Sequence, residues 1–260
     1  MSTAASFMRV AQRTPLSLEQ CVFHLPFGTP TIKETHVFIG REGYVLAHDP
    51  IAKIPNWVSY RLTPAHSVGL IKRSDAFSTD QSLPANNRSE PGDYAKSNFD
   101  KGHMACDADM KWNTLVERES FLMSNMAPQH GDLNRFVWEH LEVAVRAWTI
   151  KSQQDHLIYV GPIYDSSCNT IGGNKVVVPN GFYKIIINLI TNECAAFEFP
   201  HLPPYQYPSD FRPFLSDVSA IEGKTGISFP MPANVSTLSQ NNLWVEDVSV
   251  ISEATKKLKS

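Results

Sequence analysis

The stretch FDKGHMACDADM, residues 99–110, places a histidine directly after Asp-Lys-Gly and follows it with small residues, a cysteine and two acids. Asp100 and Gly102 would flank a turn, because glycine allows backbone conformations that are closed to other residues. A histidine that emerges through such a turn can have its tautomer and orientation fixed by a neighbour, as a general base near neutral pH requires. We therefore expect the turn to present His103, and the acids that follow it to begin a solvated helix.

Composition places the chain among ordinary globular proteins. It has 260 residues, of which 42% are hydrophobic and 19% charged, enough for one large domain with a sizeable core. The formal net charge of -3 argues mildly against a nucleic-acid binder, although a local site can still be positive. Four scattered cysteines without a C-x-x-C pair predict neither a zinc ribbon nor a dense disulfide framework, and their pairing stays open: Cys21, Cys106, Cys168 and Cys194.

The N-terminus carries no recognisable targeting signal. MSTAASFMRVAQRTPLSLEQ has neither the apolar region nor the cleavage site of a Sec-type signal peptide, and no apolar run in the chain is long enough to span a membrane. We therefore expect a soluble protein with no membrane partner. Its localisation stays open between export by a signal-independent route and the cytoplasm, where an inhibitor would restrain it.

The order of patterned segments predicts an α+β fold. Strands come first, then a long polar loop, then helices, then strands again, which favours helices laid on a mostly antiparallel sheet. The expected strands are a hairpin at 36–50 and runs at 56–64, 155–165, 174–180 and 182–190. The expected helices are 110–126, 133–150 and a short one at 216–226, with a frayed basic tail from 254. The loop 74–98 is long enough to be functional.

Polar residues recur every fourth position along the strongest helix. Asn134, Trp138, Glu142 and Arg146 fall on one i, i+4 row. Taken alone, Asn134 is better interpreted as a helix cap, and the Glu–Arg pair as a surface ion pair of little energetic worth. An amide oxygen, a carboxylate and a guanidinium on one helix side would, however, also suit a hydrated Mg²⁺ and a phosphate.

Three spaced motifs in this order resemble one family. DKGHMA at 100–105, FLMSNMAPQ at 121–129 and LNRxxWxxLE at 133–142 are similar to the DNA/RNA non-specific endonucleases. These ββα-metal nucleases include endonuclease G and the secreted sugar-non-specific bacterial nucleases. The segments NWVSYRL, YVGPIY and VVVPNGFYKI also resemble strands of the family. The family motif is usually D-R-G-H, so Lys101 is a departure.

The resemblance implies a catalytic role for each matching residue. His103 would be the general base that activates water, and Asn125 would help position His103 or the phosphate. Asn134 would be the direct protein ligand of Mg²⁺, and Glu142 would hold metal-bound waters. Arg146 would bind the scissile phosphate or its developing charge.

Further residues would bind the substrate or support the site. Arg73 falls where the family places an upstream phosphate-binding arginine, with Lys72 as the adjacent candidate. Lys101 and Arg135 would also contact substrate, while Asp100 would brace the turn. Because lysine offers a point charge where arginine offers a planar fork, Lys101 could slow the enzyme or change its substrate preference without abolishing activity.

The implied activity is Mg²⁺-dependent hydrolysis of DNA and RNA with little sequence specificity, leaving 5′-phosphate ends. Mn²⁺ or another divalent ion could take the place of Mg²⁺. The partners implied are the DNA and RNA backbone and, by family habit, a homodimer; a protein inhibitor is a further expectation. The nuclease domain would span residues 35–230, between an N-terminal arm at 1–34 packed on the body and a C-terminal extension at 231–260.

Several other interpretations stay open. A structural zinc site could combine His103 and Cys106 with His130 or His140, but no second tight ligand pair exists. Cys106 could be a nucleophile paired with His103, although a small buried residue is the simpler account. Beyond these, the chain could bind nucleic acid with weak or no cleavage, or hydrolyse another kind of phosphodiester.

Overall fold

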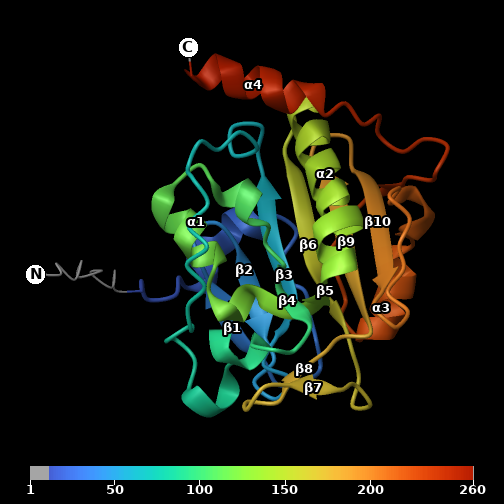
Figure 1. Cartoon of the computed structure of the whole chain (residues 1–260). Helices are drawn as coiled ribbons and strands as arrows, with labels where there is room; N and C mark the ends of the chain where they lie inside the picture. Colours follow the sequence, from blue (N-terminus) through green and yellow to red (C-terminus); the bar gives the residue numbers. More distant parts are fainter. Residues whose placement is uncertain (1–11, 260) are drawn as a thin grey trace, which may run out of the picture.

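The computed structural model describes residues 12–259, and an eight-stranded sheet forms its centre (Figure 1). The strands run in the order β1-β2-β3-β6-β9-β10-β11, and β12 pairs with β10. All neighbours are antiparallel except the pair β10–β12. The bounds are Val37–Gly40 (β1), Val45–His48 (β2), Pro55–Leu62 (β3), His156–Ile163 (β6), Gly181–Asn188 (β9), Glu193–Pro200 (β10), Leu215–Ser216 (β11) and Ser236–Thr237 (β12).

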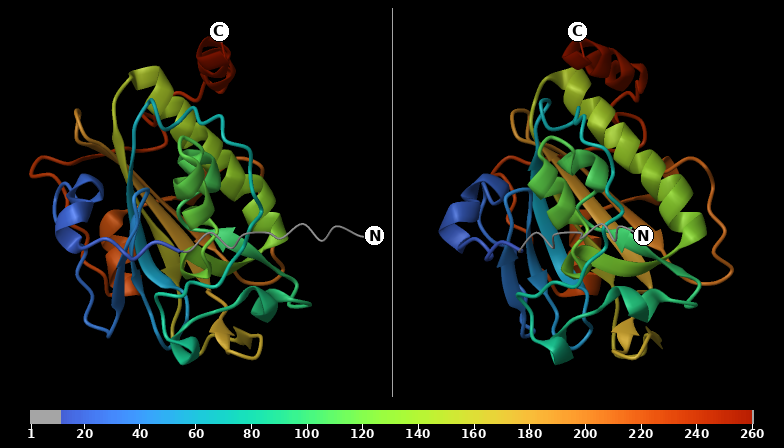
Figure 2. Two further views of the ribbon diagram at one scale, coloured as in Figure 1. Left: turned by 90° about the vertical axis from the view of Figure 1, so that its left-hand side faces the viewer. Right: turned by 60° about the vertical axis from the view of Figure 1, so that its left-hand side comes forward.

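Helices cover both faces of this sheet, so its central strands are buried on both sides (Figure 2). One face packs against α2 (Glu139–Ser152), and α1 (Thr114–Ser120) lies on the same side. The other face carries α3 (Val218–Thr225) and the short helix η1 (Leu18–His24). Strand β9 alternates accordingly, since Phe182 and Ile186 pack on the α2 face while Tyr183 and Ile185 pack on the opposite face.

The residues of the candidate site lie mainly on a separate pair of strands followed by a helix. Strands β4 (Phe99–His103) and β5 (Met126–His130) pair with each other, and the π-helix η6 (Leu133–Trp138) then leads directly into α2. Gly102 lies within β4, where a Cβ atom would come 2.5 Å from Gln129 Oε1. A glycine is therefore needed at position 102 because Gln129 of the neighbouring strand lies so close to it. The expectation that Gly102 adopts a special backbone conformation is wrong.

The predicted fold class is confirmed, and so are most predicted elements. The expected hairpin at 36–50 and strands at 56–64, 155–165 and 182–190 correspond to β1–β2, β3, β6 and β9. The helix at 216–226 is α3, which ends at Gly226 with φ +68°, the left-handed conformation typical of a glycine after a helix. The loop 74–98 is irregular apart from η2 (Ala85–Asn87) and η3 (Pro91–Tyr94).

Other expectations were wrong in ways that have local causes. The helix expected at 110–126 is confined to α1, because Asn113 caps its start and the chain must turn back into β5. The segment 174–180 contributes only β8 (Val176–Val177), paired with β7 (Thr170–Ile171). The sequence reading missed β10, and the tail expected to fray forms α4 (Ser249–Lys259). None of the helices in the described part of the chain is long and apolar enough to cross a membrane.

The N-terminal segment contacts the body of the protein from residue 12 onward; residues 1–11 lie outside the described residues. The Arg13 guanidinium contacts the carboxylates of Glu42 and Glu119, and Leu16 forms a bridge with Gly40. The proposed domain boundaries at 34 and 230 stay a prediction.

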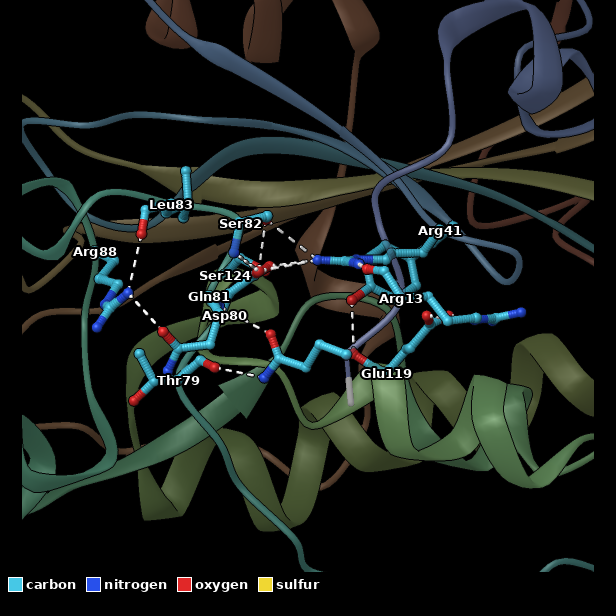
Figure 3. A network of polar contacts seen from close by, with 12 residues as sticks. Arg13, Arg41, Thr79, Asp80, Gln81, Ser82, Leu83, Arg88, Glu119 and Ser124 are labelled. Atoms are coloured by element: carbon cyan, nitrogen blue, oxygen red, sulfur yellow. Dashed lines mark hydrogen bonds and ion pairs between the residues drawn. The ribbon is translucent and has the colours of Figure 1, made fainter. Parts of the chain in front are cut away.

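A buried ion pair fastens the long loop to the sheet (Figure 3). Arg41, in the β1–β2 turn, donates to both carboxylate oxygens of Asp80 at 2.9 Å, and the side chains of the pair are 1% and 0% exposed. Asp80 also accepts hydrogen bonds from the hydroxyls of Ser82 and Ser124. These contacts hold the loop beside η5 (Met123–Asn125), which leads into β5.

Replacing Asp80 should destabilise the fold strongly. The variant Asp80→Ala leaves the Arg41 guanidinium buried without a counter-charge, and we expect it to lose about 3–5 kcal/mol of unfolding free energy. Urea unfolding followed by circular dichroism would measure the loss. The matched control is Asp210→Ala, which breaks the exposed Arg212–Asp210 pair and should cost about 1 kcal/mol or less. Equal losses in the two variants would contradict this role for Asp80.

Candidate active site

A cleft of about 440 Å³ opens between the β4–β5 hairpin, the start of the long loop and the η6–α2 helix. It contains eight of the ten residues expected at the site: Arg73, Asp100, Lys101, His103, Asn134, Arg135, Glu142 and Arg146. The other two, Gly102 and Asn125, do not line it. The fold therefore brings the candidate base and the candidate metal and phosphate ligands into one cavity, although they come from three segments of the chain.

The imidazole of His103 lies at the end of β4 against an aromatic wall. Its ring packs edge-on against Phe121, with 4.7 Å between centroids, and 5.6 Å from the ring of Phe77. The Nε2 atom is buried without a hydrogen-bond partner among the described residues, and the residue lines the cleft. Burial disfavours the charged imidazolium and lowers the pKa of His103 to about 4, against the opposing effect of the Asp107 carboxylate.

Asn125 supports His103 through the backbone. Its side chain is fully buried and makes three hydrogen bonds: Nδ2 donates to the carbonyls of Ala105 and Ser120, and Oδ1 accepts from the Ala105 amide. The Asn125 carbonyl also accepts from the Met104 amide. A direct contact of Asn125 with phosphate, one of the two roles considered, does not fit this placement. The geometry instead fixes the chain immediately after His103.

Asp100 organises the start of the helix. Its carboxylate accepts hydrogen bonds from Arg135 Nε at 2.8 Å and from Asn134 Nδ2 at 3.0 Å, and it forms an ion pair with Arg135. Asp100 thus contacts η6 from within strand β4, so the turn that it was expected to brace does not form. Because Nδ2 of Asn134 is held in this way, Oδ1 is left without a partner among the described residues. Asn134 lies inside the π-helix, whose N-cap is Asp132, so the helix-cap interpretation is wrong.

Glu142 and Arg146 each have a partner that was not predicted from the sequence. Glu142 Oε1 accepts a hydrogen bond from Lys184 Nζ at 3.0 Å, and Arg146 donates to Asp109 Oδ1 at 3.0 Å. Burial raises the pKa of Glu142, while the Lys184 ammonium opposes that rise. The expected surface pair between Glu142 and Arg146 is therefore replaced by two inward-facing pairs.

The acids after His103 are buried, so the expected solvated helix is wrong. Asp107 and Asp109 are 7% and 2% exposed and lie in the short helix η4 (Asp107–Met110). Asp107 pairs with Arg73, and Asp109 accepts from both Arg146 and the Tyr60 hydroxyl. The sequence feature that could have indicated this burial is the spacing of the two acids, two residues apart and directly after the motif. A lone lysine within the apolar run FYKIIIN was the corresponding sign for Lys184.

The donor set suits a hard cation held through few protein groups. No group of three or more His, Cys, Asp or Glu side chains that could hold a metal exists among residues 12–259, which fails to support the zinc interpretation. The cleft instead presents the Oδ1 atom of Asn134 and the Oε2 atom of Glu142, neither of which has a hydrogen bond from the described residues. Uncharged and charged oxygens of this kind fit Mg²⁺, which retains several waters and often uses one or two protein ligands.

Comparisons with known proteins agree on one family. The sequence model of the DNA/RNA non-specific endonucleases matches residues 25–236. Human mitochondrial endonuclease G is 32% identical over 203 residues, which cover 73% of this chain and 68% of that protein. Nuclease C1 of Cunninghamella echinulata var. echinulata is 31% identical over 234 residues, covering 82% and 90%. A chain in the crystal structure of the EndoG/EndoGI complex superposes with a TM-score of 0.74 at 28% identity, covering 84% of this chain and 95% of that chain.

The cysteines provide a direct test of the nucleophile interpretation. All four thiols are free, and burial raises the pKa of Cys106 well above its usual range, which disfavours the thiolate. Only Cys168 is more than slightly exposed. We expect a thiol reagent such as DTNB to modify Cys168 quickly in the native protein, and Cys168→Ser to abolish that fast phase. Rapid modification of Cys106 in the folded protein would instead revive its role as a nucleophile.

Proposed function

Because the chain belongs to the DNA/RNA non-specific endonuclease family, we propose that it hydrolyses the backbone of both DNA and RNA with a divalent cation, Mg²⁺ by preference. The products would carry 5′-phosphate and 3′-hydroxyl ends. The observation that carries this proposal is the shared cleft, in which the imidazole of His103 meets the amide of Asn134 and the carboxylate of Glu142.

His103 is the general base in this proposal. Its environment keeps the imidazole neutral near pH 7, and the tautomer with its proton on the buried Nε2 leaves a lone pair on Nδ1. That lone pair accepts a proton from a water molecule as the water attacks phosphorus. Since Phe121 and Phe77 confine the ring, its orientation is set before substrate binds, as general-base catalysis requires.

Asn134 and Glu142 are the residues that would hold the cation, Asn134 through Oδ1 and Glu142 through bound water. When present, a divalent cation neutralises charge that develops on the phosphate and the leaving oxygen. Asp100 orients the Asn134 side chain. Its carboxylate accepts a hydrogen bond from Asn134 Nδ2, so the amide oxygen of Asn134 points away from Asp100. Asn134→Asp would bring a second carboxylate close to Asp100 and is a poor substitute for that reason.

The cations of the cleft bind the phosphate. The Arg146 guanidinium donates to Asp109, and the Arg73 guanidinium donates to Asp107 and Asp75. Paired guanidiniums keep a fixed direction and still have free N–H groups for phosphate oxygens. Contacts of this type read the backbone and carry little sequence information, and none requires a 2′-hydroxyl, so DNA and RNA should both be substrates.

Restraint by a protein inhibitor is part of the proposal. It is supported by the likeness to a chain solved in the EndoG/EndoGI complex, whose description concerns the mechanism of EndoG inhibition. Full nuclease activity in a fresh lysate of the producing cells, equal to that of the purified protein, would contradict this part.

A plasmid and RNA digestion assay tests the core of the proposal. Wild type should cut both substrates with Mg²⁺ and neither with excess EDTA. His103→Ala should cut about 10²–10⁴-fold more slowly, because the general base is lost. A matched control is His66→Ala, which removes a histidine that stacks on Trp112 outside the cleft and should leave cutting near wild type. Tight binding by wild type without any cutting would favour the inactive-binder interpretation.

The titration of His103 gives a second test. Burial disfavours the protonated ring, so its pKa falls and the neutral form that accepts a proton persists as the pH drops below 6. In the metal-free protein we expect the imidazole resonance of His103 to titrate near pH 4, with the signal assigned by its loss in His103→Ala. A midpoint at or above the ordinary value of about 6.5 would show that the ring is exposed to solvent and would contradict this environment.

A further inference from the structure

Lys184 is a charged residue in the middle of the apolar strand β9. Its side chain is only 1% exposed, and its neighbours along the strand belong to the hydrophobic clusters on the two faces of the sheet. Burying an ammonium group is costly unless a counter-charge and hydrogen bonds accompany it. The position of Lys184 therefore calls for a specific partner.

That partner is Glu142, across the interface between sheet and helix. Lys184 Nζ donates to Glu142 Oε1 at 3.0 Å and lies 4.4 Å from the centroid of the Trp138 ring. Trp138, at the end of η6, and Glu142, in α2, lie one helical turn apart, so the ring and the carboxylate together hold the ammonium. The remaining oxygen, Oε2, has no hydrogen-bond partner in the described part of the chain.

We propose that Lys184 is a positioning residue for the cation site: by holding Oε1 of Glu142, it directs Oε2 into the cleft beside Asn134. This inference rests on the proposed function, because it assigns the reason for the ion pair to the cation that Glu142 would hold. Lys184 itself does not line the cleft.

Stability alone gives a weak reason for such a pair. A buried ion pair often contributes no more than well-packed apolar residues of similar size, since the desolvation of both charges offsets their attraction. An apolar residue at position 184 would suit the surrounding Phe182 and Ile186 packing. What an apolar residue could not do is hold the carboxylate in one orientation, and outer-shell partners of this type tune cation affinity.

Binding of Mn²⁺ to the full chain without nucleic acid tests the inference. Free Mn²⁺ can be followed by EPR, so the readout does not depend on cleavage. We expect Lys184→Met to weaken Mn²⁺ binding about 10–100-fold. Lys184→Arg, which keeps the charge and a donor, should recover part of the loss. The matched control Lys224→Met removes an exposed partner of Glu198 and should bind Mn²⁺ like wild type.

A double-mutant cycle separates positioning from general damage. If Lys184 acts through Glu142, then Lys184→Met should cause no further loss of Mn²⁺ affinity in a Glu142→Gln background. Additive losses, or unchanged affinity in a folded Lys184→Met variant, would overturn the inference. Should Lys184→Met fail to fold, Lys184→Gln keeps an N–H donor without the charge and serves in the same cycle.

The same experiment distinguishes the two proposals. Wild type that binds Mn²⁺ and cuts nucleic acid, with Lys184→Met equal to it in affinity, would overturn the positioning role alone. Wild type that neither binds Mn²⁺ nor cuts would overturn the proposed function, and the positioning role with it.

Discussion

The position of His103 depends on a chain of buried polar contacts that begins in the turn between β1 and β2, at the edge of the sheet. Arg41 holds Asp80, Asp80 holds Ser124, and the next residue, Asn125, binds the backbone just after His103. Each member is buried, so each contact is costly to leave unmade. The long loop 74–98 thereby has two roles: Asp80 holds the segment that binds the backbone after His103, and Phe77 lines the cleft. This linkage explains why a loop without regular structure is held so firmly.

Oppositely charged pairs set the electrostatic character of the cleft. Arg146 with Asp109, Arg73 with Asp107, Arg135 with Asp100 and Lys184 with Glu142 each join one cleft group to a partner from another segment. Such pairs fix the direction of a side chain before any substrate arrives, which is the condition under which charged groups stabilise a developing charge without reorganising. The same pairs explain why the site appears only after folding: none of them joins residues that are close in sequence.

The sequence predicted the parts of the site that local pattern controls. The strands β1–β3, β6 and β9, the helix with its polar row, and the family indicated by three ordered motifs were predicted, and the family and fold class are confirmed. The partners were not predictable in the same way, because Asp109 and Lys184 acquire meaning only through contacts with α2. Local patterning was also misleading where tertiary packing dominates. The run DADM was expected to be solvated because of its two acids, but Asp107 pairs with Arg73, and Asp109 accepts from Arg146 and Tyr60.

Lys101 is held at the cleft by aromatic rings rather than by a carboxylate. Among the cations lining the cleft, Arg73, Arg135 and Arg146 are matched by carboxylates, whereas Lys101 forms no ion pair with any residue from 12 to 259. Its ammonium lies 4.9 Å from the ring centroid of Phe77 and 5.7 Å from that of Tyr94, contacts that hold a cation without cancelling its charge. An ammonium without an ion pair thus lies two residues before His103, and the carboxylate of Glu139, which lines the same cleft, likewise forms no ion pair among residues 12–259. The compact ammonium of Lys101 fits between the two rings. Compared with an arginine at this position, lysine keeps the positive charge and lacks only the planar, two-pronged hydrogen-bond geometry of a guanidinium.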